Sequence, residues 1–153
     1  NGNFKPFKDS TFDDKLMYTC HRYGGEPTKE AIMDFIQFRD SVNLPMYMGE
    51  IGHNTNEWMA AFCKTMEENN IGWTFWPYKK ADGSSFVGIT PPENWNAIIQ
   101  FSEAPRGTYK GIRDARPNQQ MVRKAMMDFI EASKFENCVI QEGYINALGL
   151  KAS

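Results

Sequence analysis

Four side chains that can do chemistry or stack against a ring follow three short apolar segments of this sequence. His21 and Tyr23 come just after the first segment, Glu50 follows the second, and Trp76 ends the third. In α/β folds the reacting groups gather at the carboxyl ends of the strands, where loops and helix N-termini converge. The coincidence across three successive segments therefore predicts one functional site that contains these four residues.

Each of these side chains also has a structural interpretation when it is taken singly. A carboxylate at a strand end is often a surface or capping charge, and a lone histidine is often half-buried. Tyr23 and Trp76 each fit ordinary core or turn packing. Glu50, however, lies between Gly49 and Gly52, and small residues let the backbone bend sharply and let a substrate approach the carboxylate.

The elements that must position these residues alternate between strand and helix. Short apolar runs before glycine turns predict strands, and apolar residues at helical spacing predict amphipathic helices, the second of them capped by Thr55. The predicted strands cover 16–20, 44–48 and 71–76, the helices cover 28–41, 55–69, 94–101, 117–132 and 143–148, and a loop, a charged turn and a basic link cover 1–14, 79–83 and 105–117. This alternation predicts a parallel α/β sheet whose continuously apolar strands are buried on both faces.

The composition is that of a globular protein and excludes several functional classes. The 153 residues suit about one domain, and the hydrophobic (41%) and charged (24%) fractions are ordinary. The net charge of -2 argues against nucleic-acid binding and against attraction to anionic membranes. No apolar stretch approaches the roughly 18 residues of a membrane span. The aromatic fraction of 14% is high and suits surfaces that stack against sugars.

Neither a metal nor an organic cofactor is expected. Two histidines and three cysteines with no CxxC pair leave no metal-ligand set, and the sequence has no glycine-rich phosphate loop. Cys20, Cys63 and Cys138 are widely spaced, which favours buried free thiols. A single disulfide with one thiol left over stays open.

Three motifs in this order resemble the last three strands of glycoside hydrolase family five, the cellulase family. They are His-Arg-Tyr at 21–23, Gly-Glu-Ile-Gly at 49–52, and Trp76 at the end of the third segment. The resemblance covers about 15–80, and the segment 137–144 is similar, less specifically, to the closing region of such barrels. It implies a (β/α)8 TIM barrel of which this chain supplies strands six to eight.

The resemblance also implies a role for each residue. Glu50 would be the catalytic nucleophile of a retaining glycosidase, Tyr23 would hydrogen-bond its carboxylate, and His21 would order the site and the substrate hydroxyls. Trp76 would be the platform under the sugar. Such donors keep a carboxylate ionised, and a sugar face stacks well on an indole.

The sequence departs from the family pattern in lacking the acid/base glutamate, which follows the fourth strand in an Asn-Glu-Pro-like motif. The Asn56-Glu57 pair is the nearest in appearance, but it opens a helix and is not assigned that role. Because such a barrel needs about 250 residues, we expect 1–153 to be the C-terminal part of one catalytic domain, incomplete alone. Strands one to five would come from a second chain or a missing segment, and without them Phe35 and Phe62 are expected on exposed apolar faces.

Two further pairs of residues are candidates for substrate binding. His53 and Asn54 lie just past Glu50 and could reach the leaving-group side of the cleft, or could make ordinary loop hydrogen bonds. Lys79 and Lys80 follow Trp76 and could donate to sugar hydroxyls, although a solvated charge suits at least one of them.

The expected activity is that of a retaining endo-β-1,4-glucanase acting on a plant polysaccharide, with no nucleic-acid or membrane partner. A mannanase, a xyloglucanase and an exo-glucanase of the same fold remain alternatives, and a polysaccharide substrate implies an extracellular, periplasmic or cell-surface protein. Two other classes of protein fit the sequence less well. A carbohydrate-binding module would be an all-β sandwich, which the helices oppose. A small flavodoxin-like binding or signalling domain would suit the length but would need a phosphate-binding or acidic-pocket loop after its first strand, which residues 21–25 match poorly.

Overall fold

The computed structural model describes Asp13 and residues 15–150, so the loop predicted over 1–14 lies almost wholly outside the described residues. The chain divides into two compact units. The first comprises Asn1–Tyr78, Ser84–Phe86 and Gln141–Ser153, and the second comprises Lys79–Gly83 and Val87–Ile140. Along the chain, the second unit is therefore an insertion within the first.

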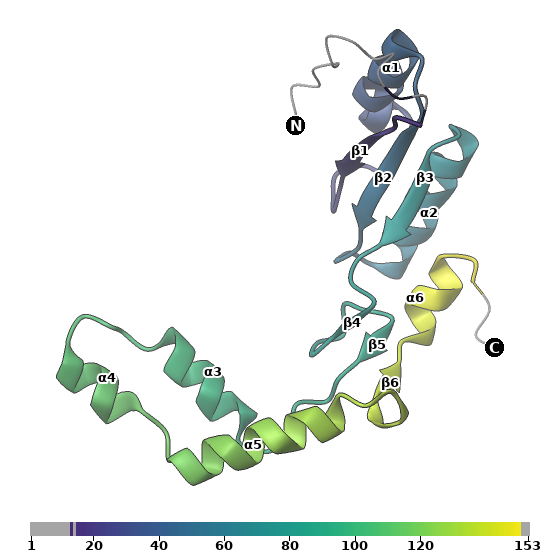
Figure 1. Ribbon diagram of the computed structural model, residues 1–153. Helices are drawn as coiled ribbons and strands as arrows, with labels where there is room; N and C mark the ends of the chain where they lie inside the picture. Colours follow the sequence, from purple (N-terminus) through teal and green to yellow (C-terminus); the bar gives the residue numbers. More distant parts are fainter. Residues whose placement is uncertain (1–12, 14, 151–153) are drawn as a thin grey trace. The chain divides into compact units, whose positions relative to one another are not determined.

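The first unit contains the predicted parallel sheet (Figure 1). Strands β1 (Tyr18–His21), β2 (Met46–Ile51) and β3 (Gly72–Phe75) pair in the order β1-β2-β3, and both ladders are parallel. The first crossover is a 3-10 turn, η1 (Glu30–Ile32), followed by helix α1 (Met33–Val42), and the second is helix α2 (Asn56–Glu68). The predicted alternation of strand and helix is confirmed, with element boundaries displaced by a few residues.

The core of the first unit lies between one face of this sheet and helices α1 and α2. Most of its buried side chains come from β2 and from the two crossovers, among them Met46, Met48, Ile51, Ile32, Phe35, Ile36, Met59, Phe62 and Met66. The expectation that Phe35 and Phe62 are exposed is wrong, since they are 7% and 0% exposed. Each helix turns its apolar face to the sheet, so these rings are covered within the unit itself.

The opposite face of the sheet is polar and open to solvent. Thr19 and His21 on β1 and Thr74 on β3 are exposed there. The prediction that the strands are buried on both faces is therefore wrong for β1 and β3. Their residues alternate between half-buried and exposed. These two strands are the edges of a three-stranded sheet that has helices on one face. The described residues thus form an open α/β layer pair and not a closed barrel.

Helix α6 (Glu142–Ala147) returns the chain to the first unit and confirms the helix predicted over 143–148. Leu148, just past its end, is buried in the core. The Phe75 ring stacks on Phe86 at a centroid distance of 4.2 Å and contacts the Tyr144 ring at 5.2 Å. The hydroxyl of Tyr144 also donates to the Asn54 carbonyl at 3.1 Å, which ties the C-terminal helix to the loop after β2.

The second unit consists of three very short strands and three helices. The strands are β4 (Lys79–Lys80), β5 (Val87–Gly88) and β6 (Val139–Ile140), and the helices are α3 (Trp95–Glu103), α4 (Tyr109–Ala115) and α5 (Gln119–Ala132), with a 3-10 turn η2 (Phe135–Asn137) after α5. Strand β5 pairs in parallel with β4 and antiparallel with β6. The Trp95 ring stacks on Phe129 at 4.2 Å and joins α3 to α5.

Two predictions for the second unit are wrong. The segment 79–83 begins with strand β4 because Lys79 and Lys80 pair with β5, a long-range contact that a charged turn sequence does not reveal. The basic link over 105–117 contains helix α4, whose N-cap is the Thr108 hydroxyl accepting from Gly111 N at 3.0 Å. An ion pair four residues apart, between Lys110 and Asp114, adds to that helix.

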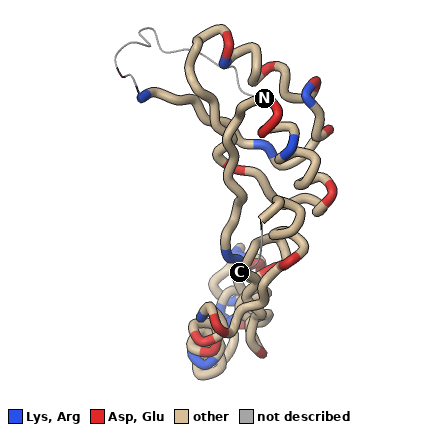
Figure 2. The backbone as a smooth tube through the Cα atoms, turned by 90° about the vertical axis from the view of Figure 1, so that its right-hand side faces the viewer, with Lys and Arg blue, Asp and Glu red and all other residues tan. Residues whose placement is uncertain are grey.

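Charged residues of both signs are interspersed along the backbone (Figure 2). Several form ion pairs one helical turn apart, such as Lys124 with Asp128 at 2.5 Å and Lys64 with Glu68 at 3.8 Å. In the part of the chain that the structure describes, no helix is both long and apolar enough to pass through a bilayer.

All three cysteines are free thiols, as predicted. Cys63 is buried in the core of the first unit, whereas Cys20 and Cys138 are half-buried, so the expected burial is wrong for these two. Burial raises the pKa of Cys20 to about 11 and that of Cys63 to about 12. Both thiols therefore stay protonated, and so unreactive, near neutral pH.

Candidate active site

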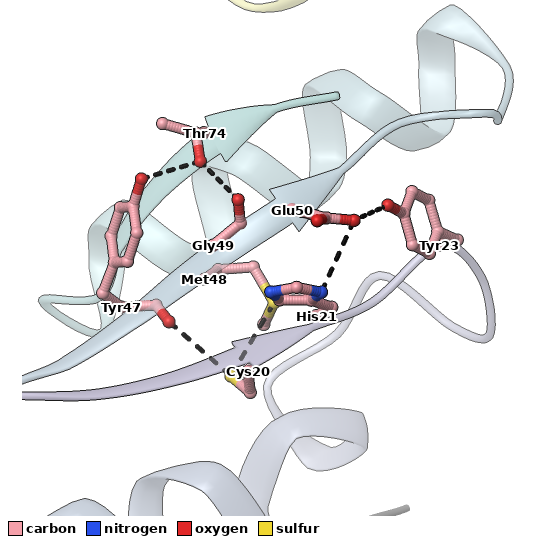
Figure 3. Close-up of polar contacts among 8 residues, drawn as sticks. All are labelled: Cys20, His21, Tyr23, Tyr47, Met48, Gly49, Glu50 and Thr74. Carbon is pink, nitrogen blue, oxygen red and sulfur yellow. Dashed lines mark hydrogen bonds and ion pairs between the residues drawn. The ribbon is translucent and has the colours of Figure 1, made fainter. Parts of the chain in front are cut away.

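Strand pairing brings Glu50 and His21 side by side at the carboxyl ends of β2 and β1 (Figure 3). His21 Nδ1 lies 3.4 Å from Glu50 Oε2. Tyr23, two residues past the end of β1, donates its phenolic hydrogen to the same Oε2. Both contacts are thus made to one carboxylate oxygen, and the Glu50 and His21 side chains keep 29% and 48% of their surface exposed.

An extra residue in β2 turns Glu50 to this face of the sheet. In the β1–β2 ladder Cys20 pairs with Met48 and His21 pairs with Glu50, so Gly49 has no partner in that register. Strict alternation would place Glu50 on the same face as Met48, against the helices. A β-bulge reverses the alternation and re-aims the side chain. The core spacing of β2, with buried residues at 46, 48 and 51, is the sequence signal from which this bulge could have been predicted.

The two glycines beside Glu50 make room for neighbouring protein atoms. A Cβ at Gly49 would lie 2.5 Å from Thr19 Oγ1 and 3.0 Å from His21 Nε2, so the missing side chain lets β1 bring these groups close. Gly52 has φ +152°, a conformation that other residues rarely adopt. A Cβ there would overlap the carbonyl oxygen of Trp76. From the sequence, these glycines were expected to leave space for a substrate. The structure shows that they also leave space for the Thr19 and His21 side chains and for the Trp76 carbonyl.

Hydrogen bonds from Asn54, in the segment after β2, and from Arg22, within the loop, hold the loop that carries Tyr23. Asn54 Nδ2 donates to the Tyr23 carbonyl at 3.0 Å, and Asn54 Oδ1 accepts from Thr55 N at 2.8 Å. The Arg22 guanidinium donates to the carbonyls of Gly24 at 2.9 Å and Ala31 at 2.5 Å. Asn54 therefore makes the ordinary loop hydrogen bonds that were one of its two expected roles. Through the bond to the Tyr23 carbonyl it fixes the backbone of Tyr23.

Helix α2 anchors the same loop further along. Trp58 Nε1 donates to the Gly25 carbonyl at 2.6 Å, and Thr65 Oγ1 donates to the Pro27 carbonyl at 2.7 Å. The helix itself begins at the predicted cap, where Thr55 Oγ1 accepts from Trp58 N at 3.2 Å. Sequence reasoning missed these anchoring roles, because they depend on contacts between residues about 33 to 38 positions apart.

The pKa of Tyr23 is raised from its ordinary value of 10 to about 12. The largest cause is desolvation of the phenol, followed by its hydrogen bond to Glu50 and the negative charge of that carboxylate. The phenol therefore stays neutral over the physiological pH range and keeps its hydrogen for Glu50.

A family model described as Cellulase (glycosyl hydrolase family 5) matches residues 1–82. The chain belongs to glycosyl hydrolase family 5. The matched range includes all three strands of the parallel sheet and His21, Tyr23, Glu50 and Trp76. The resemblance seen in the sequence is thereby confirmed, and the open sheet agrees with an incomplete portion of that family's (β/α)8 barrel. Neither a curated protein nor a solved structure matches the chain.

Two further predicted site residues of this family 5 chain, Trp76 and His53, lie in the same unit as Glu50. Trp76 N donates to the carbonyl of Ile51 at 2.6 Å, and this hydrogen bond holds the Trp76 backbone against the end of β2. The Trp76 residue is 52% exposed. His53 is exposed, and its ring lies 6.0 Å from the Tyr23 ring.

The two lysines after Trp76 belong to the second unit and contact residues of that unit. Lys79 Nζ donates to the carbonyl of Ser133. Lys80 pairs with Asp82 at 2.8 Å, which fits the solvated charge expected for one of the two lysines. The binding of sugar by Lys79 stays a prediction.

The described residues offer no group of three or more His, Cys, Asp or Glu side chains that could hold a metal ion. Glu57, the carboxylate of the Asn56-Glu57 pair, lies exposed in the first turn of α2. This position agrees with leaving it out of the acid/base role.

We predict that Gly52→Ala destabilises the protein by about 1–3 kcal/mol or more, because the new Cβ meets the Trp76 carbonyl at a strained φ. Gly24→Ala is the matched control, since a Cβ at Gly24 meets nothing within 4 Å. Thermal unfolding of both variants, followed by tryptophan fluorescence, provides the measurement. Equal melting temperatures for the two variants would contradict the role of Gly52.

We also predict that Tyr23 ionises only as the pH rises toward 12. The measurement is the difference in tyrosinate absorbance between the protein and Tyr23→Phe. Because the folded pKa lies above the ordinary value of 10, the stabilisation from the neutral phenol is complete below pH 10 and is lost between pH 10 and 12. In Glu50→Gln the pKa of Tyr23 should fall toward its ordinary value. A Tyr23 transition near pH 10 in the parent protein would show that the phenol does not hold its hydrogen for Glu50.

Proposed function

We propose that this chain supplies the nucleophile, and part of the sugar site, of a retaining β-glycosidase of family 5. The observation that carries the proposal is the partly exposed Glu50 carboxylate with Tyr23 and His21 both on Oε2. Among the described contacts this arrangement leaves Oε1 available to attack. The phenol donates to Glu50 Oε2, which fixes the orientation of the carboxylate and supports a role as nucleophile.

The proposed reaction is a double displacement. Glu50 Oε1 attacks the anomeric carbon and forms a glycosyl ester, while the glycosidic oxygen departs with a proton from a carboxylic acid outside this chain. The resulting carboxylate then takes a proton from water, the water oxygen attacks the anomeric carbon, and Glu50 is released. Two inversions give net retention, and they require the two carboxyl groups to lie about 5–5.5 Å apart.

Two features support the proposal that the rest of a barrel completes this site. Strands β1 and β3 are both edges, and Thr19, His21 and Thr74 expose the polar face opposite the helices. In a closed (β/α)8 barrel that face is the interior, and every strand is paired on both sides. We therefore infer that strands one to five and the acid/base glutamate come from a missing segment or a partner chain.

The proposed substrate is a β-1,4-linked glucan, cut within the chain. The exposed Trp76 indole supports a sugar subsite, because pyranose faces stack on aromatic rings, and its backbone is bonded to the residue after Glu50. A polysaccharide of this kind would place the protein outside the cell, in the periplasm or on the cell surface.

The nucleophile is tested in the complete protein with a soluble cellulose derivative. Glu50→Gln should lower kcat at least about a thousandfold, because the covalent step is lost. Glu57→Gln is the matched control, since Glu57 is an exposed carboxylate of the same unit, and it should keep the parent activity. The chain 1–153 assayed alone should be inactive.

A second assay identifies the step that Glu50 performs. In Glu50→Gly, azide should restore turnover of an activated aryl β-glycoside and yield the glycosyl azide of inverted configuration. Parent-like activity of Glu50→Gln, or an azide product of retained configuration, would remove Glu50 from the nucleophilic role.

Trp76→Ala should reduce kcat/KM at least about tenfold, because a stacked ring contributes about 1–3 kcal/mol. Tyr109→Ala is the control, since it removes an aromatic side chain that is 95% exposed in the second unit. Steady-state kinetics on cello-oligosaccharides provide the measurement. A lowered melting temperature with unchanged kcat/KM would make Trp76 a packing residue.

A further inference from the structure

Thr74 is the residue of β3 that faces the bulge of β2. In this ladder Met48 pairs with Trp73 and Ile51 pairs with Phe75. Two residues of β2, Gly49 and Glu50, therefore stand opposite Thr74 alone. Two residues facing one is the geometry of a β-bulge, so the same irregularity that turns Glu50 to the polar face is present on both sides of β2.

The Thr74 hydroxyl lies in a directed chain of hydrogen bonds (Figure 3). Thr74 Oγ1 donates to the Gly49 carbonyl at 2.6 Å and lies 2.7 Å from the Tyr47 hydroxyl. A carbonyl only accepts, and a threonine hydroxyl has one hydrogen. The hydrogen between Tyr47 and Thr74 must therefore come from Tyr47, and the chain runs from Tyr47 through Thr74 to Gly49.

Tyr47 is itself held against β3. A Cβ at Gly72, its partner in the ladder, would lie 3.4 Å from Tyr47 Cδ2, so the ring packs over this glycine. The ring thereby reaches along β3 to place its hydroxyl on Thr74. Hydrogen bonds in such a chain polarise and strengthen one another.

We propose that Thr74 is a positioning residue for Glu50, acting through the Gly49 carbonyl, with Tyr47 as its support. The carbonyl of Gly49 and the amide nitrogen of Glu50 belong to one planar peptide unit. Fixing that carbonyl fixes the plane from which the Glu50 side chain departs. His21 and Tyr23 hold the carboxylate from the β1 side, and Thr74 holds the backbone from the β3 side.

This inference rests on the proposed nucleophilic function of Glu50, and its first test is kinetic. In the complete protein, Thr74→Val keeps the branched shape and loses the hydroxyl, whereas Thr74→Ser keeps the hydroxyl. Thr74→Val should lower kcat about ten- to hundredfold with little change in KM, because misaimed attack slows chemistry more than binding. Thr74→Ser should stay within about threefold of the parent, and Tyr47→Phe should fall between the two, since the Thr74–Gly49 bond survives without its support.

The second test does not depend on activity. If Glu50 moves, its contact with Tyr23 weakens, so the pKa of Tyr23 should fall from about 12 toward 10 in Thr74→Val and not in Thr74→Ser. The Tyr23 transition is isolated in each background by subtracting the titration of the matching Tyr23→Phe variant. If Thr74→Val does not fold, the pair Thr74→Ser and Tyr47→Phe carries the same comparison.

The outcomes separate the two proposals. A shifted Tyr23 transition in a complete protein without glycosidase activity would support the positioning by Thr74 and reject the proposed function. Parent-like kcat and Tyr23 titration in Thr74→Val would overturn the inference, and in a protein without glycosidase activity an unchanged Tyr23 titration alone would overturn it. A lower melting temperature with unchanged kcat and Tyr23 titration would make Thr74 a structural residue only, which also overturns it.

Discussion

One extra residue in β2 decides where the Glu50 carboxylate lies. The side chains of Met46, Met48 and Ile51 are buried against α1 and α2, and in a regular strand Glu50 would join them. An ionised carboxylate in that layer would cost several kcal/mol or would have to take up a proton. The bulge lets the strand keep its apolar residues in the core on both sides of Gly49 while Glu50 faces the polar side.

The core of the first unit and the candidate site share one helix. Helix α2 fills the core with Met59, Phe62 and Met66, and from its polar side Trp58 and Thr65 hold the loop after β1 that carries Tyr23. The loop that carries the Tyr23 phenol is therefore held by a helix that is itself stabilised by burial of its apolar side chains in the core of the first unit. Such support matters for the proposed role of Glu50, because a hydrogen bond to a nucleophile helps only if both partners are already in place.

One face of the parallel sheet is covered by helices and the other is open. Membership in family 5 explains this difference, because the family fold is a (β/α)8 barrel. One face is covered by α1, α2 and their apolar side chains, and the other exposes threonine, histidine and tyrosine groups. Polar groups of this kind tolerate water, so the unit can present the face openly. In the closed barrel that we propose for the complete protein, the same face would be the interior and its carboxyl-end edge would be the catalytic cleft.

The sequence alone was sufficient to predict the three strands, the helices between them, the cap at Thr55, the family, and the convergence of His21, Tyr23 and Glu50. The elements, the cap and the convergence follow from local periodicity, cap chemistry and the rule that parallel strands end at one edge. The family follows from the resemblance of the motifs at 21–23, 49–52 and 76. Only the tertiary structure decided the burial of Phe62 and the strand at Lys79–Lys80. It also decided that Gly52 leaves room for the Trp76 carbonyl and that Asn54 hydrogen-bonds the backbone of Tyr23. Each of these depends on the register of a ladder or on which layer covers a face, and both are set by contacts between residues far apart in the chain.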